Sequence, residues 1–419
     1  MLSRIKIITL LVVLAIALSA YFFIFSSYDL EKFLSREVNI LNEFNLGFLK
    51  FGHEAKFSYI EKINEGKKML ESSQPLKYAS NGSGISSKQI AFAVLNTDTG
   101  EVFEKRAWLD QVQAENYSQT GLVRLVMDDD GEDISIQPNW FNSFNSDYKI
   151  ENHPEMAVVA NKYLMPSSGL PSILRSKSSF TDIVYVPYSG GVHNEEVISA
   201  GREYINSKAS EAVSQLNSLG VLSRSKLNRL VTEAISNDLI KNIMLVEHID
   251  PDMFNSSDKE RKIELIERVL VIIGSNGERA YNFTGSPAGA NGLAQFIKPT
   301  YDGIVRLYPK AQLIKDYREG MVNHVNAIKA MVLLFDRETE NLKSTISRKD
   351  LIDALGISEE MLAAAYNGGP SRVSRSVNTY GLSWIYQHFN SPELASIFRQ
   401  ETVDYVRKFQ FIRDLKIFN

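Results

Sequence analysis

The stretch SPAGANGLAQFIKPT at residues 286–300 contributes most to the fold assignment. Its small residues permit tight turns and a close approach of the backbone to a ligand. Gln295 adds an amide that can bind a sugar substituent, and Pro299 stands where proline favours the first turn of a helix. The stretch therefore predicts a ligand-binding loop followed by a helix, although an ordinary loop and helix start would fit it equally well if it stood alone.

Upstream of this stretch, the segment NDLIKNIMLVEH at residues 237–248 predicts an apolar helix that ends at Glu247. Ile243 and Ile240 lie one and two turns before it on the same helix face. Because Pro251 disfavours helical geometry in the residue before it, we expect Glu247 at a helix C-terminus, where the macrodipole raises the pKa of a carboxyl group. Cleavage of a glycosidic bond near neutral pH needs such an acid. A solvated glutamate at a helix end is the ordinary alternative.

Two further segments follow in order, AAYNGGPSRV at residues 364–373 and ETVDYV at residues 401–406. Together with residues 286–300 they resemble three ordered motifs of the lytic transglycosylases related to the soluble transglycosylases and goose-type lysozyme. The second motif departs slightly, because Gly368 stands where Ala is commoner. The resemblance covers about 170 residues, between 240 and 410, and none of residues 27–195.

The resemblance implies an all-α lysozyme-like domain that cleaves the β-1,4 bond between N-acetylmuramic acid and N-acetylglucosamine in peptidoglycan. In that family one glutamate acts as acid and then as base, and the product is a 1,6-anhydro sugar formed without water, metal or organic cofactor. The resemblance assigns the role of this glutamate to Glu247. By the same resemblance, the residues that position the glycan and its N-acetyl groups are Gln295, Tyr366, Asn367 and Glu401, with the backbone of Gly292 and Leu293 beneath the sugar.

Two departures from the family pattern affect the choice of the acid. His248 follows Glu247 where the family usually has Ser, and Gln295 lies 48 residues after Glu247 where about eighteen are usual. An insertion of about thirty residues with a helix at 257–273 would explain this spacing. The rival is Glu278, which lies 17 residues before Gln295, but it follows a GSNG turn and precedes the strand-like residues 280–284. A solvated turn carboxylate is a poor acid at neutral pH, so we favour Glu247.

Two other functions remain open at this point. A hydrolytic lysozyme-type muramidase would use Asp250 or Asp252 as its base. An inactive membrane-anchored protein that binds peptidoglycan or assists its assembly would tolerate the His248 departure and the insertion.

The N-terminal residues from Ile5 to Phe25 form an apolar run with one charge, Lys6, and such a run is long enough to span a bilayer as a helix. Arg4 and Lys6 precede it, so the positive-inside bias predicts a single-pass protein with its N-terminus in the cytoplasm and the bulk of the chain outside. Together with the family resemblance, this implies a protein of the bacterial inner membrane whose catalytic domain is periplasmic. A cleaved signal peptide is the alternative, because Ala17 and Ser19 offer small residues at the cleavage-site positions. We favour the uncleaved anchor because the apolar run continues to Phe25.

The chain of 419 residues has no cysteine, which excludes disulfides and thiol catalysis. Its net charge of −4 gives no sign of a basic surface for nucleic acid. With 44% hydrophobic residues, the composition is that of a globular protein. The expected partners are peptidoglycan strands and, through the N-terminal helix, the membrane; no envelope-machinery partner can be named. The acidic run at 128–133 lacks the spacing of a calcium loop and is expected to be a solvated turn, so no metal site is predicted.

The expected fold class is α+β, with an N-terminal transmembrane helix, a small mixed or mainly β domain and a C-terminal all-α lysozyme-like domain. The predicted parts are a transmembrane anchor at 1–26, a helical stalk and linker at 27–84, a β or mixed domain of unknown role at 85–192 and the lysozyme-like domain at 193–419. A hairpin is predicted around Asn96–Gly100, and residues 79–87 are read as a turn or linker. The expected helices lie near 195–218, 224–248, 257–273, 299–308, 319–339, 359–366 and 398–414.

Overall fold

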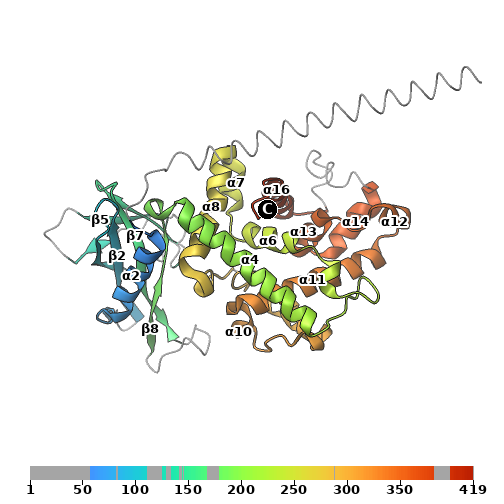
Figure 1. Cartoon of the computed structure of the whole chain (residues 1–419), viewed down its shortest axis with the longest axis horizontal. Helices are drawn as coiled ribbons and strands as arrows, with labels where there is room; N and C mark the ends of the chain where they lie inside the picture. The colour runs from blue at the N-terminus through green and yellow to red at the C-terminus, as the bar shows by residue number, and fades with distance from the viewer. Residues whose placement is uncertain are drawn as a thin grey trace, which may run out of the picture. The chain divides into compact units, whose positions relative to one another are not determined.

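The computed structural model describes residues 57–81, 84–110, 125–128, 134–140, 144, 146–167, 179–286, 288–381 and 397–418. Residues 55–419 form one compact unit that contains both strands and helices (Figure 1). The expected membrane anchor at 1–26 and the part of the expected stalk before residue 57 lie outside the described residues, as do residues 129–133 of the acidic run.

The structure corrects the expected fold class, because the described residues have a mixed α and β fold, while the expected transmembrane helix lies outside them. Among the described residues, no helix combines the length and the apolar character that crossing a bilayer requires. The three longest, α4 (Glu195–Ser218), α8 (Lys259–Asn276) and α11 (His324–Thr345), carry charged residues along their length. The described chain instead has a mixed α and β fold, in which helices pack directly on the sheet.

The strands form two sheets. The larger sheet has the order β4-β3-β2-β7-β8, with β1 paired to β2, and the smaller one has the order β5-β6-β9. All neighbours are antiparallel except β6 and β9, which run parallel. The strands are β1 (Tyr78–Asn81), β2 (Gly84–Asn96), β3 (Val102–Asp110), β4 (Val126–Met127), β5 (Ser135–Trp140), β6 (Asp147–Glu151), β7 (Met156–Pro166), β8 (Phe180–Tyr185) and β9 (Tyr188–Ser189).

The hairpin predicted around Asn96–Gly100 is confirmed, since β2 and β3 pair in antiparallel register up to Leu95 and Val102. The side chain of Asn96 accepts hydrogen bonds from the backbone N–H groups of Asp98 and Thr99, which closes the turn locally. The stretch 79–87, which was expected to be a turn or linker, instead contributes residues to β1 and β2.

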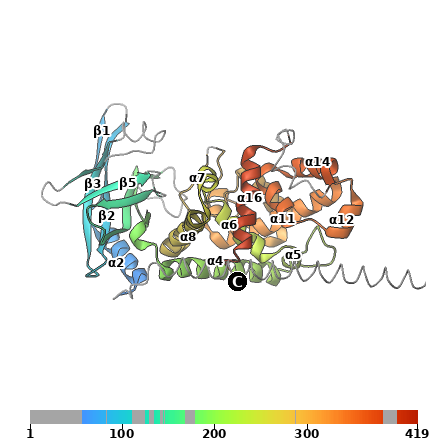
Figure 2. The same ribbon diagram turned by 90° about the horizontal axis from the view of Figure 1, so that it is seen from above.

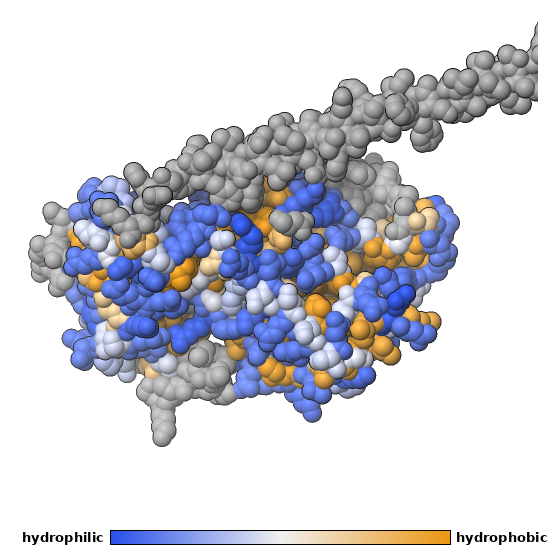
Figure 3. All heavy atoms as spheres, in the orientation of Figure 1, coloured by the Kyte–Doolittle hydropathy of each residue, from blue (hydrophilic) through white to orange (hydrophobic). Residues whose placement is uncertain are grey.

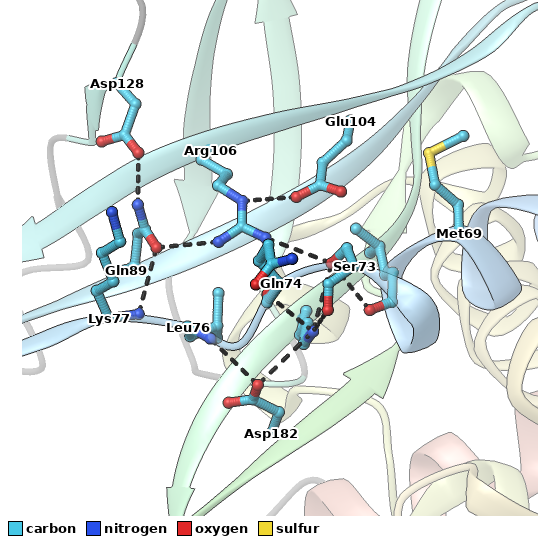
Figure 4. Close-up of polar contacts among 12 residues, drawn as sticks. Met69, Ser73, Gln74, Leu76, Lys77, Gln89, Glu104, Arg106, Asp128 and Asp182 are labelled. Atoms are coloured by element: carbon cyan, nitrogen blue, oxygen red, sulfur yellow. Dashed lines mark hydrogen bonds and ion pairs between the residues drawn. The ribbon is translucent and has the colours of Figure 1, made fainter.

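Helix α2 (Tyr59–Ser72) packs on the larger sheet, and two cations of the sheet, Lys162 and Arg106, bind the backbone just after its C-terminal end (Figure 4). Lys162 of β7 donates to the carbonyl oxygens of Ser73 and Gln74 at 3.1 and 3.2 Å, and Arg106 of β3 donates to the Gln74 carbonyl at 2.7 Å. Cations at this position satisfy the last carbonyls of a helix and complement its dipole. The described helix of the segment expected to be a stalk is therefore packed on the sheet.

The remaining helices follow the strands along the chain. Besides α4, α8 and α11, they are α5 (Val231–Ala234), α6 (Asn237–Val246), α7 (Pro251–Ser256), α9 (Lys298–Leu307), α10 (Tyr317–Val322), α12 (Lys349–Leu355), α13 (Glu359–Gly368), α14 (Pro370–Tyr380) and α16 (Gln400–Asp414). Short 3-10 turns lie at η5 (Gly190–Val192), η6 (Gly277–Arg279) and η7 (Pro309–Ala311).

Helix α6 lies at the centre of the helical part, where it contacts α4, α8, α11 and α16 (Figure 2). All its residues from Leu239 to Val246 are buried. Nearby, α4 and α8 cross so closely that a Cβ on Gly201 or Gly274 would overlap the backbone of the other helix. This crossing fixes the end of α8 relative to the helical core. Hydrophilic residues cover most of the face seen in Figure 3, with hydrophobic ones in smaller groups.

Candidate active site

Glu247 lies at the C-terminal end of α6, as its sequence environment predicts. Ser236 caps the N-terminus of this helix by accepting a hydrogen bond from the Leu239 N–H, and the Glu247 N–H closes the last turn on the Ile243 carbonyl at 3.1 Å. The helix is buried, whereas Glu247 itself keeps partial exposure to solvent. Glu247 therefore sits at the edge of an apolar core and is not fully enclosed by it.

Two side chains of α16 support this carboxyl group. The hydroxyl of Tyr405 donates a hydrogen bond to Glu247 Oε1 at 2.5 Å. Lys408, which is only 5% exposed, donates to the carbonyl oxygens of Val246 and Ile249 at 3.0 and 2.6 Å. A buried cation thus occupies the C-terminal end of α6, where the helix carbonyls would otherwise lack donors.

The surroundings of Glu247 act on its pKa in opposite directions. Burial disfavours the charged form and raises the pKa from 4.5 to about 7. The hydrogen bond from Tyr405 and the positive charge of Lys408 oppose this rise, while the negative charge of Glu401 adds to it. A carboxyl group whose pKa is raised toward neutrality can both give up a proton and take one back near neutral pH.

The loop at 291–296 has a tightly constrained backbone. Gly292 has φ +74°, and a Cβ there would lie 2.5 Å from the Met321 carbonyl oxygen, so both conformation and space require glycine. Gln295 has φ +45° and its side-chain amide donates to the Gly292 carbonyl at 2.7 Å. This amide N–H, which the sequence offered as a group to bind a sugar substituent, thus closes its own loop. The predicted helix start at Pro299 is confirmed by α9.

Two side chains beside Glu247 form hydrogen bonds to adjacent carbonyl groups of this loop. The imidazole Nε2 of His248 bonds to the Leu293 carbonyl oxygen at 2.9 Å, and the hydroxyl of Tyr366 donates to the Ala294 carbonyl oxygen at 2.5 Å. Desolvation, followed by the charge of Glu247, raises the pKa of Tyr366 well above its ordinary value. Tyr366 and the loop therefore lie next to the candidate acid.

Asn367 and Glu401 lie on the same side of the site. The Asn367 amide donates to Glu401 Oε1 at 3.3 Å and its oxygen accepts a hydrogen bond from the Thr402 hydroxyl at 2.7 Å. Glu401 is exposed, and its charge acts on Glu247. The structure thus brings Gly292, Leu293, Gln295, Tyr366, Asn367 and Glu401 together around Glu247.

Glu278 lies elsewhere, in the turn η6 at the end of α8. Its side chain is 63% exposed and forms an ion pair with Lys208 of α4. Desolvation tends to raise its pKa, but hydrogen bonds with Lys208 and Tyr204 outweigh it and the pKa is lowered overall. A carboxylate held charged in this way is unsuited to donate a proton near neutral pH.

Sequence reasoning missed Tyr405 and Lys408. Both belong to the helix that contains Glu401, at steps of four and three residues, so helical periodicity places all three on one face. That spacing was the available signal. For metals, the described parts of the chain contain no group of three or more histidine or acidic side chains that could hold an ion.

Comparison with known proteins adds no family assignment at the level of sequence. No protein-family model and no curated protein matches this chain.

Proposed function

We propose that this chain is a peptidoglycan lytic transglycosylase in which Glu247 acts as the acid and then as the base. The main supporting observation is the position of Glu247, a partly exposed residue at the end of α6, whose carboxyl accepts a hydrogen bond from Tyr405 and has its pKa raised by burial to about 7. The motif resemblance supports the same assignment, because Tyr405 and Tyr366 of two motifs act on this carboxyl, and the third motif is bonded to Tyr366 and to the neighbouring His248.

In the proposed reaction, the protonated Glu247 carboxyl donates its proton to the glycosidic oxygen between N-acetylmuramic acid and N-acetylglucosamine. The bond from C1 to that oxygen breaks, and the N-acetylglucosamine leaves with a free 4-hydroxyl. The Glu247 carboxylate then takes the proton of the muramoyl C6 hydroxyl while O6 attacks C1. A 1,6-anhydro ring forms, Glu247 is protonated again, and no water is consumed.

The remaining site residues take positioning roles in this proposal. Asn367, which is partly exposed, and the exposed Glu401 form a polar pair suited to N-acetyl and hydroxyl groups of the glycan. The Tyr366 hydroxyl and the Gln295 amide both donate to backbone carbonyls of the loop. Their role in this proposal is to fix the backbone at Gly292 and Leu293, on which a sugar would rest.

The hydrolytic alternative receives less support. Asp250 caps α7, where its carboxylate accepts a hydrogen bond from the Met253 N–H at 2.8 Å. Asp252 is exposed in the first turn of the same helix. A base that activates water needs a free lone pair aimed across the scissile bond, and Asp250 already uses one oxygen to cap a helix.

The test is digestion of purified peptidoglycan by the full chain, with mass spectrometry of the released fragments. We expect fragments that end in 1,6-anhydro-N-acetylmuramic acid, and their loss in Glu247→Gln. Glu278→Gln is the matched control and should keep wild-type release. Reducing-end muramic acid would contradict the proposal in favour of hydrolysis, while glycan binding without any release would indicate an inactive binding protein.

A further inference from the structure

The end of strand β8 is bonded to the segment that follows α8. Asn276, the last residue of α8, accepts a hydrogen bond from the Val186 N–H at 2.8 Å and donates to the Val186 carbonyl at 2.9 Å. Arg279 donates to the Val184 carbonyl at 3.3 Å. Residues 276–279, which follow the body of α8, are therefore hydrogen-bonded to the backbone at the end of β8.

Tyr185, between these two residues, makes the contact closest to the site. Its buried hydroxyl accepts a hydrogen bond from the backbone N–H of Tyr281 at 3.1 Å. Phe283 packs against the same tyrosine ring and stacks on Phe144, with ring centroids 4.4 Å apart. Residues 281–283 thus lie against the sheet and not free in solvent.

Tyr281 has an unfavourable backbone conformation that these contacts maintain. Its φ is +59°, which costs a residue with a side chain about 1–2 kcal/mol. The carbonyl of the preceding Ala280 accepts a hydrogen bond from the buried His324 at 3.0 Å, so the peptide is held from both sides. Such conformations persist where the surroundings determine them strongly, and they cluster at functional sites.

The ring of Tyr281 orients His248. The two rings stack with centroids 3.6 Å apart and an interplanar angle of 12°. The His248 Nε2 must carry the hydrogen, because its partner at 2.9 Å is the Leu293 carbonyl oxygen. Since His248 directly follows Glu247 in the chain, its ring connects the backbone that carries the acid to the loop that faces it.

We propose that Tyr185, Tyr281 and His248 are positioning residues through which the end of β8 fixes the loop at 291–296 relative to Glu247. The strand-containing part of the chain is then a support of the active site. This inference rests on the proposed function for its catalytic consequence, although the geometry it describes is testable without activity.

The alternative is that these contacts only stabilise the fold, and substitutions of matched stability separate the two. Tyr185→Phe removes the hydroxyl that accepts from Tyr281. Tyr308→Phe is the control, because its hydroxyl donates to the buried Asp336 at 2.9 Å and not to the loop at 291–296. We expect both variants to melt at lower temperature by similar amounts, but only Tyr185→Phe to lower kcat, by about tenfold with KM within about twofold, because small misplacements of reacting groups slow the chemical step.

A second pair of variants tests His248 itself. His248→Phe keeps a ring to stack on Tyr281 but lacks the donor to Leu293, whereas His248→Gln places an amide N–H close to the position of Nε2. We expect kcat to fall about tenfold in His248→Phe and to recover in part in His248→Gln. Wild-type kcat in both Tyr185→Phe and His248→Phe would overturn the inference, as would an equal loss in the Tyr308→Phe control.

A measurement without substrate keeps this test separate from the proposed function. The imidazole ¹H and ¹⁵N resonances of His248 in the full chain, assigned by their loss in His248→Phe, report the Nε2–H tautomer and the ring current of Tyr281. We expect them to shift in Tyr185→Phe and to stay unchanged in Tyr308→Phe. Unchanged resonances in Tyr185→Phe would overturn the positioning inference even in an active enzyme, while the expected shift in a chain that releases no glycan would refute only the proposed function.

Discussion

The hydroxyl of Tyr405 donates a hydrogen bond to the carboxyl of Glu247, which joins α16 to the end of α6 across 158 residues of chain. This bond favours the carboxylate, whereas burial favours the neutral acid and is the larger effect. The balance leaves the pKa of Glu247 at about 7, a value at which one residue can serve as acid and base in successive steps.

The first prediction concerns the pH dependence of catalysis. The reaction begins with protonated Glu247, so kcat/KM should be level at acidic pH and fall about tenfold per pH unit above about 7. Initial rates of glycan release across pH 5–9 measure this. A profile that rises through pH 7 would instead require the ionised form of a group and would count against Glu247 as the acid.

The second prediction tests the Tyr405 contact. Because its hydrogen bond lowers the pKa of Glu247, Tyr405→Phe should move the alkaline limb of the pH profile to higher pH. Loss of an orienting bond should also lower kcat at pH 6, by about tenfold. Tyr308→Phe serves again as a control for the loss of a buried hydroxyl. An unmoved pH limb would mean that the Tyr405 bond does not act on the titrating group.

The third prediction concerns stability. The pKa of Glu247 is raised from 4.5 to about 7 in the folded state, so its contribution to stability is full below pH 4.5 and is lost as pH rises through 7. Glu247→Gln stays neutral and escapes this loss. Relative to wild type, its free energy of unfolding should therefore increase by on the order of 3 kcal/mol between pH 4.5 and 8.

Denaturant unfolding at several pH values measures this difference. Glu260→Gln, at an exposed position in the first turn of α8, is the control and should follow wild type. A parallel pH dependence in Glu247→Gln and wild type would show that another group is responsible.

Local patterns in the sequence predicted much of the helical part. The apolar period and the proline at 251 placed Glu247 at the end of a buried helix, and α4, α8, α9, α13 and α16 lie close to their predicted ranges. The predicted helix at 224–248 is instead α5 and α6, because Ser236 adopts an extended conformation and caps a new helix. The catalytic role of Glu247 stays a prediction.

Contacts between distant segments were beyond such patterns. Residues 280–284 were read as strand-like from their β-branched and aromatic composition, yet Tyr281 is left-handed and held by Tyr185 and, through Ala280, by His324. The composition of a short segment reports its intrinsic preference, which tertiary contacts override. In the same way, helical spacing places Lys408 on the face of Glu401, but only the tertiary structure shows that it binds the carbonyls at the end of α6.

The fourth prediction concerns this buried lysine. Lys408→Met removes the donor to the Val246 and Ile249 carbonyls and should lower stability by at least about 2 kcal/mol. It also removes a positive charge that lowers the pKa of Glu247, so the alkaline limb of the pH profile should move upward. Lys310→Met is matched, because the exposed Lys310 also donates to a backbone carbonyl, that of Gly220. The control should change neither property appreciably.

The fifth prediction compares two glycine substitutions near the proposed sugar site: one causes only backbone strain, and the other also causes a steric overlap. Gly289 and Gly292 both have positive φ, but a Cβ at Gly289 meets open space, whereas at Gly292 it would lie 2.5 Å from the Met321 carbonyl oxygen. Gly289→Ala should therefore cost only about 1–2 kcal/mol. Gly292→Ala must in addition displace the loop that His248 and Tyr366 hold beside Glu247. We expect Gly292→Ala to lose both stability and most glycan release, as measured by thermal unfolding and product yield. Equal stability and equal glycan release in the two variants would show that the loop position does not govern activity.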